Sequence, residues 1–157
     1  MRRLSGVLLI GALILLPALT QGHLASSARV AAQATKLAFE GDVVLWQLAI
    51  KPDKTGDFEA LMGKVKEALT KSEKPERKAQ AASWKVFKMA KPLPDGNIAY
   101  LLMLQGPVKD ADYTLLNILY EANADPVQQK ALYDQYRGAF AATLAQTPYT
   151  AVLDMSK

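Results

Sequence analysis

Four polar or aromatic side chains lie on otherwise apolar segments, where they could contact a ligand. Gln47 interrupts one apolar run, Tyr100 lies in another, Asn117 belongs to a helical stretch, and Trp84 opens a strand-like segment. If Gln47 and Tyr100 share a face, an amide and a phenol would line a pocket and orient a small aromatic or quinone-like molecule. The alternative is that each side chain packs in the core or on a helix surface with its hydrogen bonds satisfied. We therefore predict Gln47, Tyr100, Asn117 and Trp84 as ligand-binding residues.

The sequence contains no set of reactive side chains that would mark a catalytic centre. It has no cysteine, which excludes disulfides, thiolate nucleophiles and Cys-ligated metals. Its one histidine, His23, precedes the predicted domain, so that domain has no imidazole for acid–base catalysis or haem ligation. No nucleophile elbow, phosphate-binding glycine loop or metal-spaced carboxylate set occurs. We predict no metal and no cofactor, and we assign no catalytic residue.

The N-terminus predicts export. Arg2 and Arg3 precede an apolar segment at 4–19, which is shorter than the roughly 20 residues that a membrane-spanning helix needs. Small residues follow it, as in a secretory signal peptide. An Ala-x-Ala pattern favours cleavage after Ala34, cleavage after Gly22 also fits, and an uncleaved anchor is the alternative. We expect a periplasmic or secreted protein with no stable membrane association after cleavage.

Most of the net positive charge belongs to this leader. The whole chain has 19 basic and 15 acidic side chains, a net charge of +4. Residues 1–34 contain three arginines and no acid, so their removal leaves 16 basic and 15 acidic side chains. The basic residues that remain are spread through 51–91, which is typical of a solvated face, and we expect no nucleic-acid partner. Residues 35–157 are predicted to form a single domain.

Hydrophobic periodicity predicts an α+β domain with four strands. The strands are expected at 42–50, 84–90, 98–105 and 149–155, and the helical segments at 57–72, 73–82, 110–121 and from 126 to about 144. The order is βαββαβ, with the second helical connection split in two. This order predicts a ferredoxin-like fold, in which a four-stranded antiparallel sheet has its helices on one face.

Both faces of the predicted sheet are apolar, which indicates a partner. In the first strand, Leu45 and Ala49 point one way while Trp46 and Leu48 point the other. Two right-handed crossovers would place the helices on one side only. A monomer would then expose an apolar face to water. We therefore predict a homodimer in which a second copy covers the open face.

Several segments resemble the dimeric α+β barrel superfamily, in particular the antibiotic-biosynthesis-monooxygenase-like group. They are the apolar strand at 42–50, the Trp-Lys-Val-Phe-Lys strand at 84–88, the Pro-Asp-Gly loop at 94–96 and the strand with Tyr100. The resemblance covers most of 42–155. It implies a family that includes cofactor-free oxygenases, haem-degrading enzymes, isomerases and proteins with no known activity. The absence of a histidine from the domain departs from the haem-degrading branch.

Two functions follow as hypotheses. The first is an exported dimeric protein that binds a small apolar or aromatic molecule or acts structurally. The second, which the resemblance implies, is a cofactor-independent monooxygenase or isomerase-like enzyme acting on a phenolic or quinone-type substrate. A polar pair converging in a closed pocket would favour the enzyme. A sheet packed solidly against its helices would favour the first hypothesis. The sequence leaves two places open for the pocket, the dimer face and the sheet–helix interface.

Overall fold

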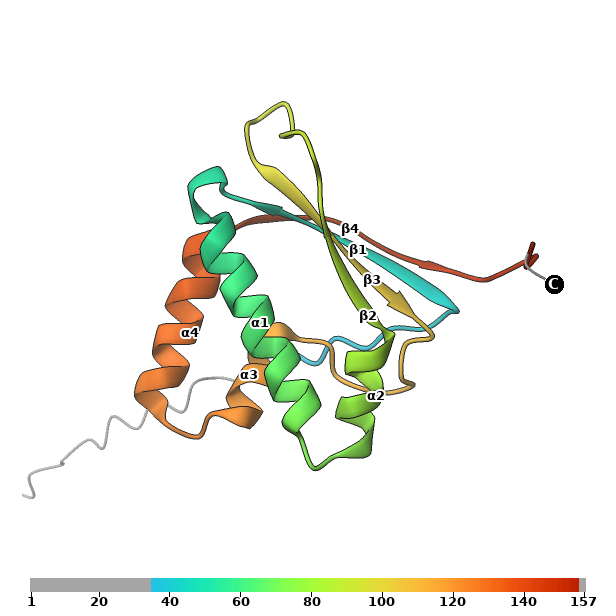
Figure 1. The fold of residues 1–157 in the computed structure, drawn as a ribbon, viewed down its shortest axis with the longest axis horizontal. Helices are drawn as coiled ribbons and strands as arrows, with labels where there is room; N and C mark the ends of the chain where they lie inside the picture. The colour runs from blue at the N-terminus through green and yellow to red at the C-terminus, as the bar shows by residue number, and fades with distance from the viewer. Residues whose placement is uncertain (1–34, 156–157) are drawn as a thin grey trace, which may run out of the picture.

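The chain folds as a four-stranded antiparallel sheet with its helices on one side (Figure 1). The computed structural model describes residues 35–155, and the predicted signal peptide at 1–34 lies outside the described residues. The strands are β1 (Val43–Ile50), β2 (Trp84–Lys88), β3 (Ile98–Gln105) and β4 (Phe140–Tyr149). The helices are α1 (Thr55–Lys71), α2 (Pro75–Ser83), α3 (Leu115–Ala122) and α4 (Pro126–Ala139), with a 3-10 turn at Pro52–Lys54. The predicted α+β class with an antiparallel sheet is confirmed.

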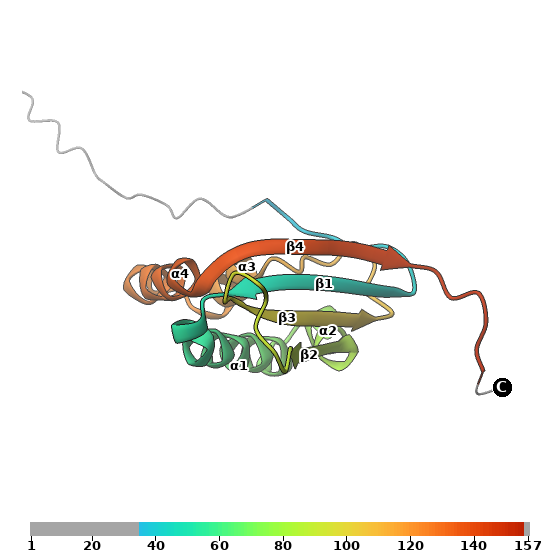
Figure 2. The ribbon, with the colours of Figure 1, turned by 90° about the horizontal axis from the view of Figure 1, so that it is seen from above.

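The strand β1 lies inside the sheet, whose order is β2-β3-β1-β4. It pairs with β3 along its whole length, from Val43 opposite Gln105 to Ile50 opposite Ile98. On its other side it pairs with β4, with two register shifts. The strands β2 and β4 are the edges. Figure 2 looks down on the face away from the helices and shows β4, β1 and β3 lying side by side.

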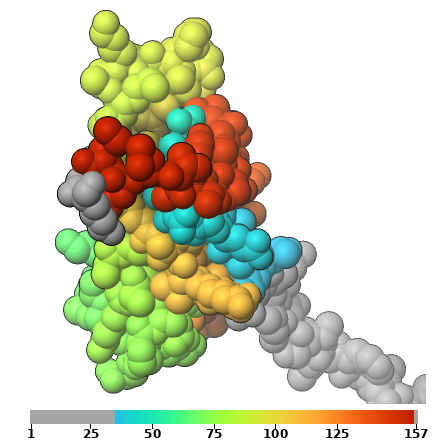
Figure 3. All heavy atoms as spheres, turned by 90° about the vertical axis from the view of Figure 1, so that its right-hand side faces the viewer, coloured from blue at the N-terminus to red at the C-terminus, as the bar shows by residue number. Residues whose placement is uncertain are grey.

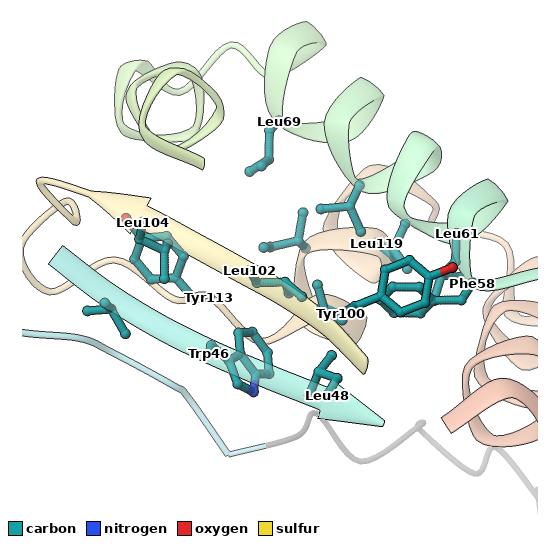
Figure 4. Close-up of a cluster of buried hydrophobic side chains, with 14 of the residues drawn as sticks. Trp46, Leu48, Phe58, Leu61, Leu69, Tyr100, Leu102, Leu104, Tyr113 and Leu119 are labelled. Carbon is teal, nitrogen blue, oxygen red and sulfur yellow. The ribbon is translucent and has the colours of Figure 1, made fainter. Parts of the chain in front are cut away.

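The core fills the space between the sheet and the helices (Figure 4). Every second residue of β1 and β3 points into it, and α1 contributes residues at helical spacing. The buried side chains include Val44, Trp46, Leu48 and Ile50 of β1, Tyr100, Leu102 and Leu104 of β3, Phe58, Leu61, Val65 and Leu69 of α1, and Ile118 and Leu119 of α3. Burial of each large apolar side chain contributes roughly 1.5–3 kcal/mol. This packed layer is the main source of stability in the described chain.

The helix α3 begins at Leu115, so the prediction of a helix from about 110 was wrong for its first turn. Asp110 has a φ of 56°, which is incompatible with a right-handed helix. The Asp112 carboxylate accepts a hydrogen bond from the Thr114 backbone N–H at 2.9 Å and holds a turn instead. The start of α4 is as predicted, because Asp125 accepts from the backbone N–H of Val127 at 3.0 Å.

The predictions of a long second helix and of a strand at 149–155 were also wrong. The helix α4 ends at Ala139, and β4 occupies Phe140–Tyr149. The backbone groups of β1 need partners on both sides, and β4 supplies them along one side. Residues 150–155 continue beyond the end of the sheet without a regular element (Figure 1).

A glycine allows the end of β4 to lie against the start of β1. Gly41 has a φ of +95°, and a Cβ atom there would lie 2.9 Å from the carbonyl oxygen of Tyr149. The same oxygen accepts a hydrogen bond from the Asp42 backbone N–H at 2.8 Å. Both the conformation and the close approach require the absence of a side chain.

Residues 35–40, here called the N-terminal strap, close one side of the core. The Leu37 backbone N–H donates to Asp112 Oδ1 at 3.0 Å, and the Leu37 carbonyl accepts from the Tyr113 N–H at 2.7 Å. The Phe39 ring lies 5.5 Å from the Tyr113 ring and 5.9 Å from the Trp46 ring. The strap is therefore part of the folded domain.

Candidate functional site

The sheet face away from the helices, here called the open face, is lined mainly by apolar side chains. Residues paired across antiparallel strands point to the same side, so the register identifies its members. They are Val43, Leu45, Gln47 and Ala49 of β1, Ala99, Leu101, Met103 and Gln105 of β3, Lys85 and Phe87 of β2, and Ala142, Ala145, Thr147 and Tyr149 of β4. Phe87 and Tyr149 are about half exposed. The open face presents apolar surface to solvent in the single chain.

Gln47 lies in the middle of this face. It follows Leu45 and precedes Ala49 among the outward residues of β1, and it is paired with Leu101 of β3 and Ala145 of β4. Its side chain is exposed. An amide offers both a donor and an acceptor, so Gln47 places one polar group among apolar neighbours. Small-molecule sites are likewise lined mainly by apolar side chains with a few polar groups.

Tyr100 points to the opposite face, so the predicted pocket containing both Gln47 and Tyr100 does not form. Tyr100 pairs with Leu48, and its ring packs in the core against Phe58 at 4.7 Å in an edge-on arrangement. Its hydroxyl donates a hydrogen bond to Glu59 Oε1 at 2.6 Å. The phenol is therefore held by α1.

Glu59, Lys88 and Tyr100 form a cluster at the β2 side of the sheet. The Lys88 Nζ atom donates to Glu59 Oε1 at 3.0 Å and lies 5.8 Å from the centre of the Tyr100 ring. Burial, together with the hydrogen bond to Glu59, raises the pKa of Tyr100. The hydrogen bonds from Tyr100 and Lys88 lower the pKa of Glu59. The phenol is neutral and the carboxylate ionised at neutral pH, an arrangement that ties α1 to β2 and β3.

Asn117 holds the turn that precedes α3. Its Nδ2 atom donates to Asp112 Oδ2 at 2.8 Å. Burial alone would raise the pKa of Asp112, but the hydrogen bonds from Asn117, Thr114 and Leu37 outweigh it and lower that pKa. The Asn117 amide thus binds Asp112 on the helical side of the sheet, whereas Gln47 lies on the open face.

Trp84 belongs to an aromatic cluster in the core. Its ring centroid lies 6.5 Å from that of Trp46 and 5.5 Å from that of Tyr113. Within residues 35–155 the indole N–H groups of Trp46 and Trp84 have no hydrogen-bond partner. Their contribution is therefore ring packing, the alternative that the sequence left open for Trp84.

Arg77 and its partners were missed by the sequence reasoning. The Arg77 side chain donates to the Asp112 carbonyl at 2.7 Å, to Gln80 Oε1 at 2.8 Å and to Glu121 Oε2 at 2.7 Å, and Arg77 is only 8% exposed. The hydrogen bond from Arg77 lowers the pKa of Glu121 against the opposing effect of burial. The surrounding sequence at 73–82 is so rich in charge that it predicts a solvated surface, and nothing in it distinguishes the one buried cation.

Beside this network a cleft of about 660 Å³ lies between α1, α3 and α4. Ala68, Ile118 and Leu132 give it apolar walls. Its charged side chains include Lys71 paired with Glu67 and Arg77 paired with Glu121. These pairs neutralise one another, so the cleft presents no excess of either charge.

The evidence for function comes from the geometry of the described residues. In the part of the chain that the structure describes, no helix is long and apolar enough to cross a membrane. Among the same residues no group of three or more His, Cys, Asp or Glu side chains could hold a metal ion. Comparison of the chain with protein-family models, with curated proteins and with solved structures gives no match.

Proposed function

We propose that this protein is an exported homodimeric binding protein, in which the open faces of two copies meet and enclose a small apolar or aromatic molecule. The observation that carries the proposal is the apolar open face with the Gln47 amide in its middle. A single chain leaves this surface in water, whereas a second copy removes it from water and stabilises the pair. A two-fold axis would bring the same patch of each copy together.

We also propose that the fold is ferredoxin-like and of the dimeric α+β barrel type. The strand order β2-β3-β1-β4 and the helices on one side support it. The division of the second connection into α3 and α4 is in keeping with the sequence pattern. Export is supported by the leader-like N-terminus and by the strap, because cleavage after Gly22 or Ala34 leaves Leu37 and Phe39 in the mature chain.

Binding without catalysis is favoured by the way the polar core residues are used. Tyr100 and Asn117 are engaged by Glu59 and Asp112, and the layer between the sheet and the helices is filled with side chains. A solid layer of this kind offers no closed reaction chamber of the sort that a cofactor-independent oxygenase or isomerase needs. We place the ligand site on the open face, where Gln47 would orient the ligand.

The homodimer is tested by light scattering after size-exclusion chromatography at micromolar concentration. The wild-type chain is expected to have twice the monomer mass. Leu101→Lys places a charge in the centre of the open face and is expected to give a folded monomer. Val127→Lys, at an exposed position of α4, is the matched control and is expected to stay dimeric. A monomeric wild-type chain would overturn the proposal.

The ligand is tested with 1,4-naphthoquinone as the probe in a thermal-shift titration. The probe is expected to raise the Tm of the wild-type dimer, and Gln47→Leu is expected to weaken binding about fivefold, as for the loss of one hydrogen bond. Gln128→Leu, at an exposed position of α4 away from the open face, makes the same change and serves as the control. Oxygen uptake with the corresponding quinol would contradict binding without catalysis and would support the enzyme hypothesis.

A further inference from the structure

Residues 150–155, here called the C-terminal arm, carry large apolar side chains that the rest of the described chain does not cover. Val152 is 96% exposed, Leu153 is 75% exposed and Met155 is 88% exposed. Figure 1 shows the arm extending past the end of β4, away from the helices. Figure 3 looks at that end of the molecule and shows the arm standing in front of the strand ends.

The direction in which the arm leaves the sheet is fixed by hydrogen bonds at its base. The Ala151 backbone N–H donates to Asp42 Oδ2 at 2.8 Å, and the Asp42 N–H donates to the Tyr149 carbonyl at 2.8 Å. Beyond this base, Leu153 and Met155 are two residues apart, so in an extended chain they lie on the same side. Val152 lies on the opposite side. The charged Asp154 shares the side of Val152, so the side with Leu153 and Met155 is the apolar one and is suited to packing on another apolar surface.

The two edges of the sheet differ in their protection. The strand β2 at one edge carries Lys85 and Lys88, which oppose pairing with another strand. The strand β4 at the other edge has no charged residue along its ten positions, and its protection is limited to Pro148 and two register shifts against β1. The arm leaves from β4, so exposed apolar side chains and an uncharged edge occur together. This combination indicates that a second copy covers this side of the molecule.

We propose that the C-terminal arm of each copy packs on the open face of the other copy. This inference rests on the homodimer proposed above and adds the contact that holds it. Beyond Ala151, which is held by Asp42, the four residues 152–155 reach about 13 Å when extended, and neighbouring strands lie about 4.8 Å apart, so the arm is long enough to lie across two or three strands of the partner sheet. Leu153 and Met155 would then contact the apolar side chains around Leu101 and Phe87 of the partner, and the exchange would be reciprocal.

Disulfide trapping tests where the arm lies, because the chain contains no cysteine of its own. A Leu153→Cys chain with a size tag is mixed with an untagged Leu101→Cys chain and oxidised. The expected product is a tagged–untagged disulfide dimer, and Phe87→Cys is used in the same way as a second position on the face. Val127→Cys on α4 is the matched control and is expected to give little product. Equal trapping at Val127, or none at either face position, would overturn the inference.

Truncation tests whether the arm contributes to affinity. A chain that ends at Thr150 is expected to dimerise at least tenfold more weakly than the full chain in sedimentation equilibrium. A chain that ends at Met155 keeps the arm and is expected to match the full chain. If the full chain is a monomer, the proposed homodimer itself is wrong. Another outcome is that the full chain is a dimer, the chain that ends at Thr150 dimerises equally well, and no disulfide is trapped. In that case the homodimer stands and the arm exchange alone is wrong.

Discussion

At the scale of single residues, the polar groups of this domain serve mainly to hold its own elements together. The Tyr100 ring is buried between β3 and α1, and its hydroxyl emerges at the core boundary to donate to Glu59. The Asn117 amide and the Arg77 guanidinium likewise bind the turn that contains Asp112. Only Gln47, among the four residues singled out from the sequence, lies on the surface where a ligand or partner could meet it.

The Tyr100–Glu59 hydrogen bond can be measured with a double-mutant cycle. Tyr100→Phe and Glu59→Gln each remove one side of the contact, and the coupling in the free energy of unfolding is expected to be about 0.5–1 kcal/mol, because Glu59 is exposed to solvent. Urea denaturation of the two single variants and the double variant gives the value. Coupling near zero would show that the contact adds nothing to stability.

The Arg77–Glu121 contact predicts a pH-dependent stability. Because the pKa of Glu121 in the folded chain lies below its ordinary value of about 4.5, the ionised carboxylate stabilises the fold above that pH. This contribution is lost as the pH falls through the folded pKa. Glu121→Gln is therefore expected to lower the free energy of unfolding by about 1 kcal/mol at pH 7, and this difference should be smaller at pH 3 than at pH 7.

Glu67→Gln provides the matched control for Glu121→Gln. Glu67 pairs with Lys71 on the exposed face of α1, where solvent screens the interaction. No measurable change in the free energy of unfolding is expected at either pH. A pH-independent loss of stability in Glu121→Gln would contradict the ion-pair explanation and would indicate a packing defect.

The sequence predicts which residues of one strand share a face, but it does not predict which residues of neighbouring strands lie opposite each other. It placed Gln47 with Leu45, and the structure agrees. Whether Gln47 and Tyr100 share a face depends on the register between β1 and β3, and a shift of one residue reverses the answer. Register is set by tertiary contacts, so the shared pocket could be proposed but not decided from the sequence.

At the scale of elements, the N-terminal strap and β4 are the two segments that complete the sheet–helix layer. Phe39 reaches the rings of Trp46 and Tyr113, while Phe140 continues the packing of Tyr136 with ring centroids 5.4 Å apart. That last contact explains the wrong prediction for β4. Phe140 belongs to β4 but still packs against Tyr136, four residues earlier, as it would in a continuous helix. The spacing of these two side chains therefore does not distinguish a longer helix from a strand that begins at Phe140. The strand is favoured because the backbone groups on this side of β1 need hydrogen-bond partners, which β4 supplies.

The strap is expected to be required for stability. Phe39→Ala removes a buried ring from the aromatic cluster, and the free energy of unfolding should fall by about 3 kcal/mol. Guanidinium denaturation followed by tryptophan fluorescence measures it, with a red shift in the emission of Trp46 expected if water enters. Val127→Ala, at a residue 77% exposed, is the control and should change nothing. A loss below 1 kcal/mol would show that the strap does not seal the core.

At the scale of the whole molecule, surface character separates the two sides of the sheet. The helical side carries most of the ion pairs, including Lys54–Asp57, Lys71–Glu67 and Lys130–Asp134. The open face carries apolar side chains and few charges. The charged helical side is well solvated, whereas an exposed apolar sheet face is the kind of surface that is suited to a partner. The apolar residues on both faces of the strands are visible in the sequence, whereas the distribution of the ion pairs over the helices is not.

Dimerisation through the open face predicts that thermal stability depends on protein concentration. If folding and association are linked, a tenfold rise in concentration should raise the Tm of the wild-type chain by a few degrees. Leu101→Lys should show a Tm independent of concentration. Differential scanning calorimetry over two decades of concentration measures both. A constant wild-type Tm would contradict an interface that contributes to stability.

The pairing of β1 with β4 also has a consequence for the time course of folding. The hydrogen bond between Asp42 and Ala151 joins residues 109 positions apart in the chain, and β4 follows all the other described helices and strands. During synthesis, β1 is among the first elements to be made, and it meets β3 long before β4 exists. One edge of β1 must therefore remain unpaired until all the elements between β1 and β4 have been made. Closure of the sheet is a late, long-range step, which is the kind that slows folding and lengthens the exposure of a nascent chain to aggregation.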